Sequence, residues 1–265
     1  MSVDLAVIAY RESGPSEVHM PVCRLILRID FNTVFDLMDY PGRLAQTILE
    51  TAGKDFFESV GELPQTHEVR AVTKSEMIHK EFRANPTFLL FDYQDLNGLE
   101  LSTIQDDQAF STLAAVVTAV RRAFKIDAEN RAGLRLFYVN QIAKDREAVE
   151  RAFEALVDQG IYAIVGKHFS KPRDFGLAMD GGASDGLRYS TRFGPFLGID
   201  EAAKFFQDPP KKSELLETAN FVVDVDQYQT MMKRGPELKW WKPLLQTAKE
   251  FIPALETDLT KRMHG

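Results

Sequence analysis

The sequence has little of what several classes of protein require. Its one cysteine, Cys23, excludes an internal disulfide and a cysteine-rich zinc site. No stretch approaches the ~20 apolar residues of a membrane-spanning helix. The first ten residues carry an early aspartate and no basic segment, unlike a signal peptide. These absences predict a cytoplasmic protein in which Cys23 is a buried thiol.

The chain also lacks a basic excess and the motifs of common hydrolases. It carries 32 Lys and Arg against 39 Asp and Glu, a formal net charge of −7. This charge disfavours broad affinity for nucleic acid, because phosphate binding depends on lysine and arginine. The five histidines have no zinc-site spacing, and no serine has a Gly-x-Ser-x-Gly context. We expect no cofactor and no nucleophilic hydrolase chemistry.

Two similar runs of elements follow one another along the chain. An alternating strand at residues 22–31 opens the first run, and residues 133–140 open the second. The pattern predicts an α+β fold of internally duplicated β-α-β-β-β-α units. It would form a mostly antiparallel sheet with helices packed on one face. The predicted halves, residues 1–128 and 129–265, would be related by a pseudo-twofold axis within one compact unit.

Residues that typically end helices or form turns predict where the individual helices and strands lie. Gly61 and Gly160 are placed to end helices, and Asn97-Gly98 is typical of a two-residue hairpin turn. Predicted helices run near residues 43–60, 107–124, 146–159 and 240–264. The remaining predicted strands run near residues 67–79, 87–93, 99–104, 161–169 and 221–228.

Three phrases together carry a family resemblance: residues 27–31, residues 133–142 and Val223-Asp224-Val225-Asp226. In this order and at this length, the chain resembles a sporadically distributed bacterial family of about 250–270 residues without an assigned function. That family has a central Gly-Leu-Arg-Tyr-x-Asn strand and a late Asp-x-Asp strand. Here Leu136-Phe137 precedes Tyr138, and Gln141 stands where a basic residue is common. The resemblance implies no catalytic residues; the family's patchy distribution associates it with mobile or phage-defence gene islands.

Aspartates in or beside predicted strands form the first candidate site. Asp224 and Asp226 are two residues apart, so both side chains point to one face of the sheet. With Asp30 they could hold Mg²⁺ or Mn²⁺ for phosphodiester chemistry. The alternative, which we favour, is that Asp30, Asp92, Asp224 and Asp226 pair with arginines on a polar sheet face.

Basic and aromatic residues in the second half form two further candidates. Cations beside aromatic side chains can grip phosphates and stack on bases, which predicts a nucleic-acid or phosphate site at Lys167, Lys171, Arg173, Arg188 and Arg192. The alternative, which we favour, is that these residues belong to a solvated loop or hairpin pair. Adjacent tryptophans on a helix point about 100° apart, so one can enter the core while the other meets a partner. The predicted partner-binding residues are Trp240, Trp241, Phe175 and Tyr189.

No complete catalytic set emerges, so an enzyme is the less favoured interpretation. We predict a non-enzymatic cytoplasmic scaffold or adaptor that binds partner proteins or self-assembles, in a bacterial defence or mobile-island system. The alternative is a metal-dependent phosphodiesterase or nucleotide-processing enzyme that uses the sheet carboxylates. The fold itself does not choose between them.

Overall fold

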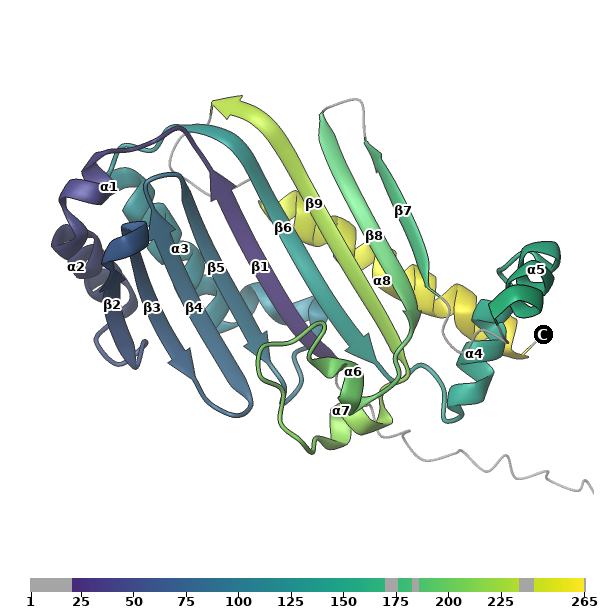
Figure 1. Ribbon diagram of the computed structural model, residues 1–265. Helices are drawn as coiled ribbons and strands as arrows, with labels where there is room; N and C mark the ends of the chain where they lie inside the picture. The colour runs from purple at the N-terminus through teal and green to yellow at the C-terminus, as the bar shows by residue number, and fades with distance from the viewer. Residues whose placement is uncertain (1–20, 170–175, 183–185, 234–240, 265) are drawn as a thin grey trace, which may run out of the picture.

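A computed structural model describes residues 21–169, 176–182, 186–233 and 241–264. Nine strands form one sheet in the order β2-β3-β4-β5-β1-β6-β9-β8-β7, and every neighbouring pair is antiparallel (Figure 1). This confirms the predicted α+β class. The strands are β1 (Val22–Asp30), β2 (Ser59–Leu63), β3 (Glu68–Lys74), β4 (Ile78–Asn85), β5 (Phe88–Asp95), β6 (Ala128–Asn140), β7 (Leu177–Gly182), β8 (Leu187–Pro195) and β9 (Phe221–Lys233).

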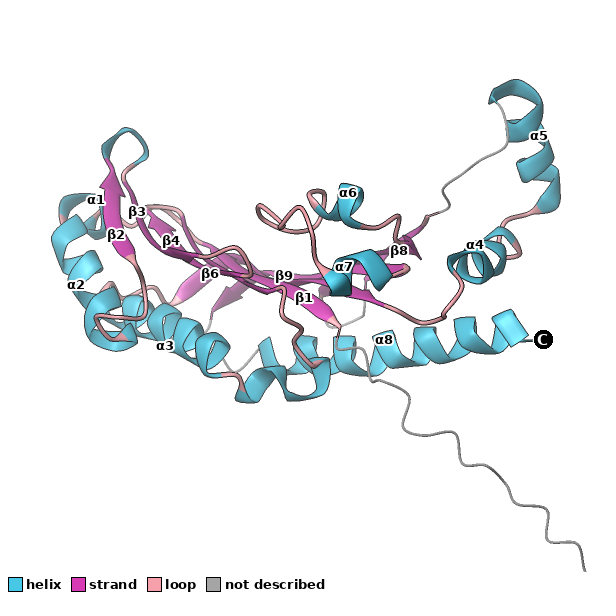
Figure 2. Ribbon diagram, turned by 90° about the horizontal axis from the view of Figure 1, so that it is seen from below, coloured by secondary structure: helices cyan, strands magenta, loops and turns pink. Residues whose placement is uncertain are grey.

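Three long helices, α2, α3 and α8, lie against one face of the sheet, while the short α6 and α7 lie on the other side (Figure 2). The helices are α1 (Asp36–Asp39), α2 (Pro41–Ala52), α3 (Gln108–Ala123), α4 (Arg146–Glu154), α5 (Gln159–Phe169), α6 (Ile199–Ala202), α7 (Glu214–Thr218) and α8 (Trp241–His264). Two 3₁₀ turns, η1 (Pro64–Thr66) and η2 (Leu101–Asp106), complete the structure. No helix in the described ranges is both long and apolar enough to cross a bilayer.

The alternation of residues in β1 explains how the two faces differ. Cys23, Leu25, Leu27 and Ile29 are fully buried on the helix side. The residues between them, including Arg24 and the other polar positions, point to the opposite face because successive strand side chains alternate. One face of the sheet is therefore the floor of the core, and the other is charged.

Aromatic side chains join the helices to the centre of the sheet. The ring of Phe110 on α3 lies 5.6 Å from Phe91 on β5 and 4.9 Å from Trp241 on α8, both edge to face. Trp241 is thus a core residue, in line with the expectation that one of the two tryptophans enters the core. Trp240 lies outside the described residues.

The strand order has a centre at β1 and β6, the first strands of the two predicted halves. These strands pair with each other, and each pairs on its other side with the last strand of its own half, β5 or β9. The first half contributes five strands and the second four. The duplication and the division at residue 128 remain predictions.

Several predicted elements differ from the observed ones. Helix α2 ends at Ala52, with Gly53 rather than Gly61 at its C-cap, and residues 59–63 are a strand. Asn97-Gly98 does not join two strands, because η2 follows it where a strand was predicted. The predicted strand at 161–169 is helix α5. Helix α8 continues through Pro253, which lies inside it.

The central motif of the second half has structural reasons for its residues. A Cβ atom on Gly133 would lie 2.8 Å from Tyr228 Cβ and 2.9 Å from Gln227 O, so only glycine fits against β9. The Tyr138 hydroxyl donates to Glu256 Oε1 on α8 at 2.9 Å, and Asn140 Nδ2 donates to the same oxygen at 2.7 Å. The motif thus joins β6 to β9 and to α8.

Replacing Glu256 by glutamine is expected to stabilise the protein at neutral pH. Burial raises the pKa of the Glu256 carboxyl above its ordinary value, although the hydrogen bonds from Asn140 and Tyr138 oppose this. A raised folded-state pKa means that the folded protein loses stability as pH rises through that pKa. Glutamine can accept the same hydrogen bonds without a charge. We expect a melting temperature about 2–4 °C higher at pH 7.5, the shift that ~1 kcal/mol gives in a chain of this size.

The control for this variant is the same comparison at pH 4, where Glu256 is protonated in the wild type. Thermal unfolding followed by circular dichroism should then show little difference between the two proteins. A variant that is less stable than the wild type at both pH values would contradict the assignment.

Candidate functional site

The sheet face opposite the three long helices is lined by arginines from five strands. The strand registers put all of them on the same face, at alternate positions of β1, β3, β4, β6 and β8 and across their neighbours. We call this surface the arginine face; its arginines are Arg24, Arg28, Arg70, Arg83, Arg131, Arg135, Arg188 and Arg192.

Six of these arginines are ion-paired with carboxylates on the same face. Arg135 holds Asp224 with two hydrogen bonds, of 2.8 Å from Nε and 2.7 Å from Nη2. Arg83 holds Glu68 in the same manner, at 3.0 and 2.9 Å. The remaining pairs are Arg24–Asp92, Arg28–Asp30, Arg70–Glu81 and Arg131–Asp226.

In all six pairs the arginine is more exposed than the carboxylate, and in five of them the arginine is well exposed. The side chains of Arg28, Arg70, Arg83, Arg131 and Arg135 are 35–46% exposed, whereas those of their acidic partners are 6–27% exposed. A guanidinium group has five N–H donors, so one bonded to a carboxylate on one side can still donate on another. The face therefore presents guanidinium groups to solvent above a layer of carboxylates.

Aromatic rings hold several of the same guanidinium groups in place. Arg28 lies 4.7 Å from the centre of the Phe88 ring, Arg135 lies 4.5 Å from Phe137, and Arg131 lies 4.4 Å from Tyr228. Such cation–π contacts contribute ~0.5–1 kcal/mol at exposed sites. Bonded to a carboxylate and stacked on a ring, these arginines are fixed before any ligand arrives.

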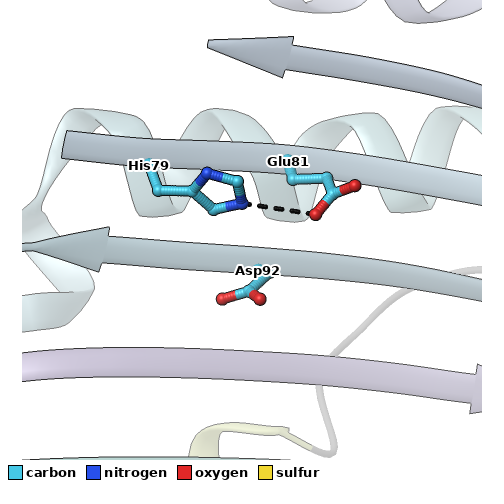
Figure 3. A group of neighbouring side chains, drawn as sticks. All are labelled: His79, Glu81 and Asp92. Atoms are coloured by element: carbon cyan, nitrogen blue, oxygen red, sulfur yellow. Dashed lines mark hydrogen bonds and ion pairs between the residues drawn. The ribbon is translucent and has the colours of Figure 1, made fainter. Parts of the chain in front are cut away.

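One buried group on this face has the composition of a metal site. His79 and Glu81 project from β4 and Asp92 from β5, all to the same side (Figure 3). Each offers one ligand atom, and these atoms lie within 4.8 Å of one another. His79 Nε2 is 3.2 Å from Glu81 Oε2, and all three residues are buried. Nitrogen and carboxylate ligands of this kind suit Zn²⁺ or Mn²⁺.

The carboxylates of this group are already neutralised by arginine. Arg24 Nε donates to Asp92 Oδ1 at 2.8 Å, and Arg70 forms an ion pair with the second oxygen of Glu81. Burial would raise the pKa of the Glu81 carboxyl, but the hydrogen bond from His79 and the charges of Arg70, His79 and Arg83 outweigh it and lower the pKa. A divalent cation would have to displace these arginines. The group is therefore balanced as an ionic network.

The residues around Arg24 also fasten the segment between β8 and β9 over this face. Arg24 Nη1 donates to the carbonyl of Phe205 at 2.9 Å. Gln94 donates to the Gln207 carbonyl at 3.0 Å and accepts from the Gln207 N–H at 2.7 Å. Lys74 forms an ion pair with Asp208, which lowers the pKa of that carboxyl. Residues 205–208 thus lie against β1, β3 and β5.

The structure does not bring Asp30 together with Asp224 and Asp226. The one group of three metal-ligand residues found in the described ranges contains none of them. Asp30 is held by Arg28 at 2.7 Å, and Asp226 is 3.2 Å from Arg131. Burial raises the pKa of Asp226, although the nearby arginines oppose this. The predicted three-carboxylate metal site is therefore corrected to a set of arginine–carboxylate pairs, the alternative favoured from the sequence.

The predicted basic and partner-binding residues are dispersed. Arg188 and Arg192 lie on β8 on the arginine face, whereas Lys167 lies on α5, outside the sheet and beyond its β7 edge (Figure 1). Tyr189 points to the opposite face, beside α8, in a hollow lined by Met179 and Phe251 among others. Lys171, Arg173 and Phe175 lie outside the described residues.

The sequence analysis did not identify the charged residues of β3 and β4 that point to the arginine face. Glu68, Arg70, His79, Glu81 and Arg83 were not singled out, although they contribute two ion pairs and the histidine of the buried group. The signal was available as charged residues at every second position of residues 68–70 and 79–83.

Comparisons with known proteins add no argument about function. No protein-family model matches the sequence, and neither does any curated protein. Among solved structures, the di-domain ARO/CYC StfQ from the steffimycin biosynthetic pathway is 11% identical, with a TM-score of 0.19, over 91% of this chain and 96% of that one. The immunity protein TplEi of the type VI secretion system (T6SS) from Pseudomonas aeruginosa is also 11% identical, with a TM-score of 0.19, over 85% and 88%.

Proposed function

We propose that this protein is a non-enzymatic scaffold or adaptor, and that it binds the acidic surface of a partner protein on its arginine face. The observation that carries the proposal is the exposure of guanidinium groups above carboxylates that are less exposed than they are. Arginine is enriched in protein interfaces and at their energetic centres. Side chains already fixed by carboxylates and rings lose little conformational freedom on binding, which favours affinity.

The charge balance of the face favours a protein over a nucleic acid. Nine lysines and arginines face seven aspartates and glutamates on it, counting Lys74 with the arginines, and Asp180 with the six paired carboxylates. Nucleic-acid affinity grows with the number of phosphates neutralised by cations. Within the described ranges, only Arg188 and Arg192 of the eight arginines form no ion pair with a carboxylate. Carboxylates of a protein surface need only the free edges of the paired arginines.

The test combines capture with variants of the arginine face. The tagged protein would be purified from its native host, and a stoichiometric partner identified by mass spectrometry would be purified and titrated by calorimetry. Arg28→Gln/Arg131→Gln should weaken the complex at least tenfold. The matched control is Arg151→Gln/Arg262→Gln, which removes two ion-paired arginines from α4 and α8.

Equal affinity of both double variants for the partner would contradict the proposal, as would capture of nucleic acid alone. Sedimentation of the purified protein across concentrations distinguishes the remaining outcome. A complex made only of further copies of this chain would indicate self-assembly in place of an acidic partner.

A further inference from the structure

A pocket of about 490 Å³ lies at one end of the arginine face, between α6 and strands β6 to β9. Its volume falls in the ~300–1,000 Å³ range of ligand pockets in proteins. Most of its wall is apolar, and a few charged groups converge on it. The residues that line it include Arg135, Phe137, Ala178, Arg192, Phe205 and Asp224.

The aromatic wall of this pocket is fixed to the sheet. The rings of Phe137 on β6 and Phe205 after α6 lie 6.1 Å apart and are tilted by 60°. The Phe205 carbonyl accepts a hydrogen bond from Arg24, and its ring also contacts Phe196 at 6.2 Å. A flat apolar group can therefore enter a space that is already formed, without ordering a loop.

Among the charged side chains that line the pocket, the cations outnumber the carboxylates by one. Asp224 lies between Arg135 and Arg192, and it is directly opposite Arg192 in the β8–β9 register. Both of its oxygens accept from Arg135. Glu201 and Lys204, which also line the pocket, pair with each other at 2.9 Å. In the parts of the chain that the structure describes, Arg192 forms no ion pair, so the pocket carries one uncompensated positive charge.

We propose that this pocket binds a small organic anion that has a single negative charge on a flat, apolar body, such as an aromatic carboxylate or sulfonate. The body would lie against Phe137 and Phe205, and the acid group would accept hydrogen bonds from Arg192. A charge-assisted hydrogen bond to a guanidinium group is stronger than a neutral one. This proposal does not depend on the binding of a partner protein.

The experiment uses two fluorescent probes that differ in charge. The full-length protein would be titrated with 1-anilinonaphthalene-8-sulfonate, an aromatic anion, and with N-phenyl-1-naphthylamine, which has the same rings and no acid group. Wild type should bind the anion at one saturable site. Arg192→Gln should weaken the anion about tenfold and change binding of the neutral probe less than twofold.

Two further variants make the result specific to the pocket. Arg188→Gln removes an arginine from the same strand and the same face that does not line the pocket, and it should leave both probes unchanged. Ala178→Trp places a large ring at the pocket wall on the edge strand β7 and should abolish binding of both probes. Circular dichroism melts would confirm that each variant is folded.

The proposal is overturned if Arg192→Gln and Arg188→Gln weaken the anion equally. It is also overturned if folded Ala178→Trp binds the anion as tightly as the wild type, because the dye would then occupy another surface. The proposal is likewise overturned if Arg192→Gln weakens the binding of both probes equally. Arg192 would then maintain the shape of the pocket and would not bind the acid group of the ligand.

Discussion

Arg121→Leu is expected to lower the free energy of unfolding by about 3–5 kcal/mol, the cost of breaking a buried ion pair from one side. Arg121 is the largest fully buried side chain among the residues that the structure describes, and its Nη2 atom lies 2.7 Å from Glu129 Oε1. Glu129, at the start of β6, is itself only 3% exposed. Leucine would remove the cation that faces this buried carboxylate.

A second variant separates the charge from the packing. Arg121→Leu/Glu129→Leu removes both charges, and exchange of a buried pair for apolar residues is often close to neutral. The double variant should therefore recover most of the stability in urea denaturation. Arg122→Leu, at the exposed position next along α3, should cost less than about 1 kcal/mol. A double variant no more stable than Arg121→Leu would show that the arginine matters for its shape alone.

Asp92→Ala is expected to cost about 3 kcal/mol and to loosen residues 205–208. Asp92 is 3% exposed and is the carboxylate partner of Arg24, whose side chain is only 11% exposed. Arg24 in turn holds the Phe205 carbonyl and lies 5.6 Å from the Phe137 ring. Loss of the carboxylate would leave a nearly buried guanidinium free to turn away from this segment. Thermal unfolding and limited proteolysis would measure the two effects.

The control for this variant is Asp30→Ala, which breaks a more exposed pair with Arg28 and should cost less than about 1 kcal/mol. Thermal unfolding of the wild type in 1 mM Mn²⁺ or Zn²⁺ tests whether His79, Glu81 and Asp92 form an ionic network or a metal site.

We expect neither metal to raise the melting temperature of the wild type. Stabilisation by metal in the wild type that disappears in Asp92→Ala would instead identify a metal centre.

The fold class could be predicted from the sequence because strand alternation and helix caps are local patterns. The alternation in residues 22–30 arises from one buried and one charged face, and it predicts β1 to within a residue. The helix predicted at 107–124 begins after Asp107, whose side chain accepts from the Phe110 N–H at 2.8 Å as a helix cap does. Local chemistry of this kind is readable without a structure.

Other features depend on contacts that no local pattern contains. Residues 161–169 include an apolar run typical of a buried strand, yet they form α5, where Ile161 and Ile164 are about 60% exposed. Asp224 resembled a metal ligand because its partner, Arg135, is 89 residues away in the chain. Which arginine meets which aspartate is decided by the register of β6 and β9, and the sequence does not fix that register.

Because β1 pairs with β6, which follows it by about 100 residues, one edge of β1 stays unpaired during part of the protein's synthesis. A ribosome that has delivered the first 127 residues has released all the strands from β1 to β5, with β1 at the border of the unfinished sheet. The open edge of β1 is then a row of unpaired backbone groups beside Leu25, Leu27 and Ile29, a template for pairing with another nascent chain. Prompt arrival of β6 closes that edge, so a delay once Asp127 has left the ribosome would favour aggregation over folding.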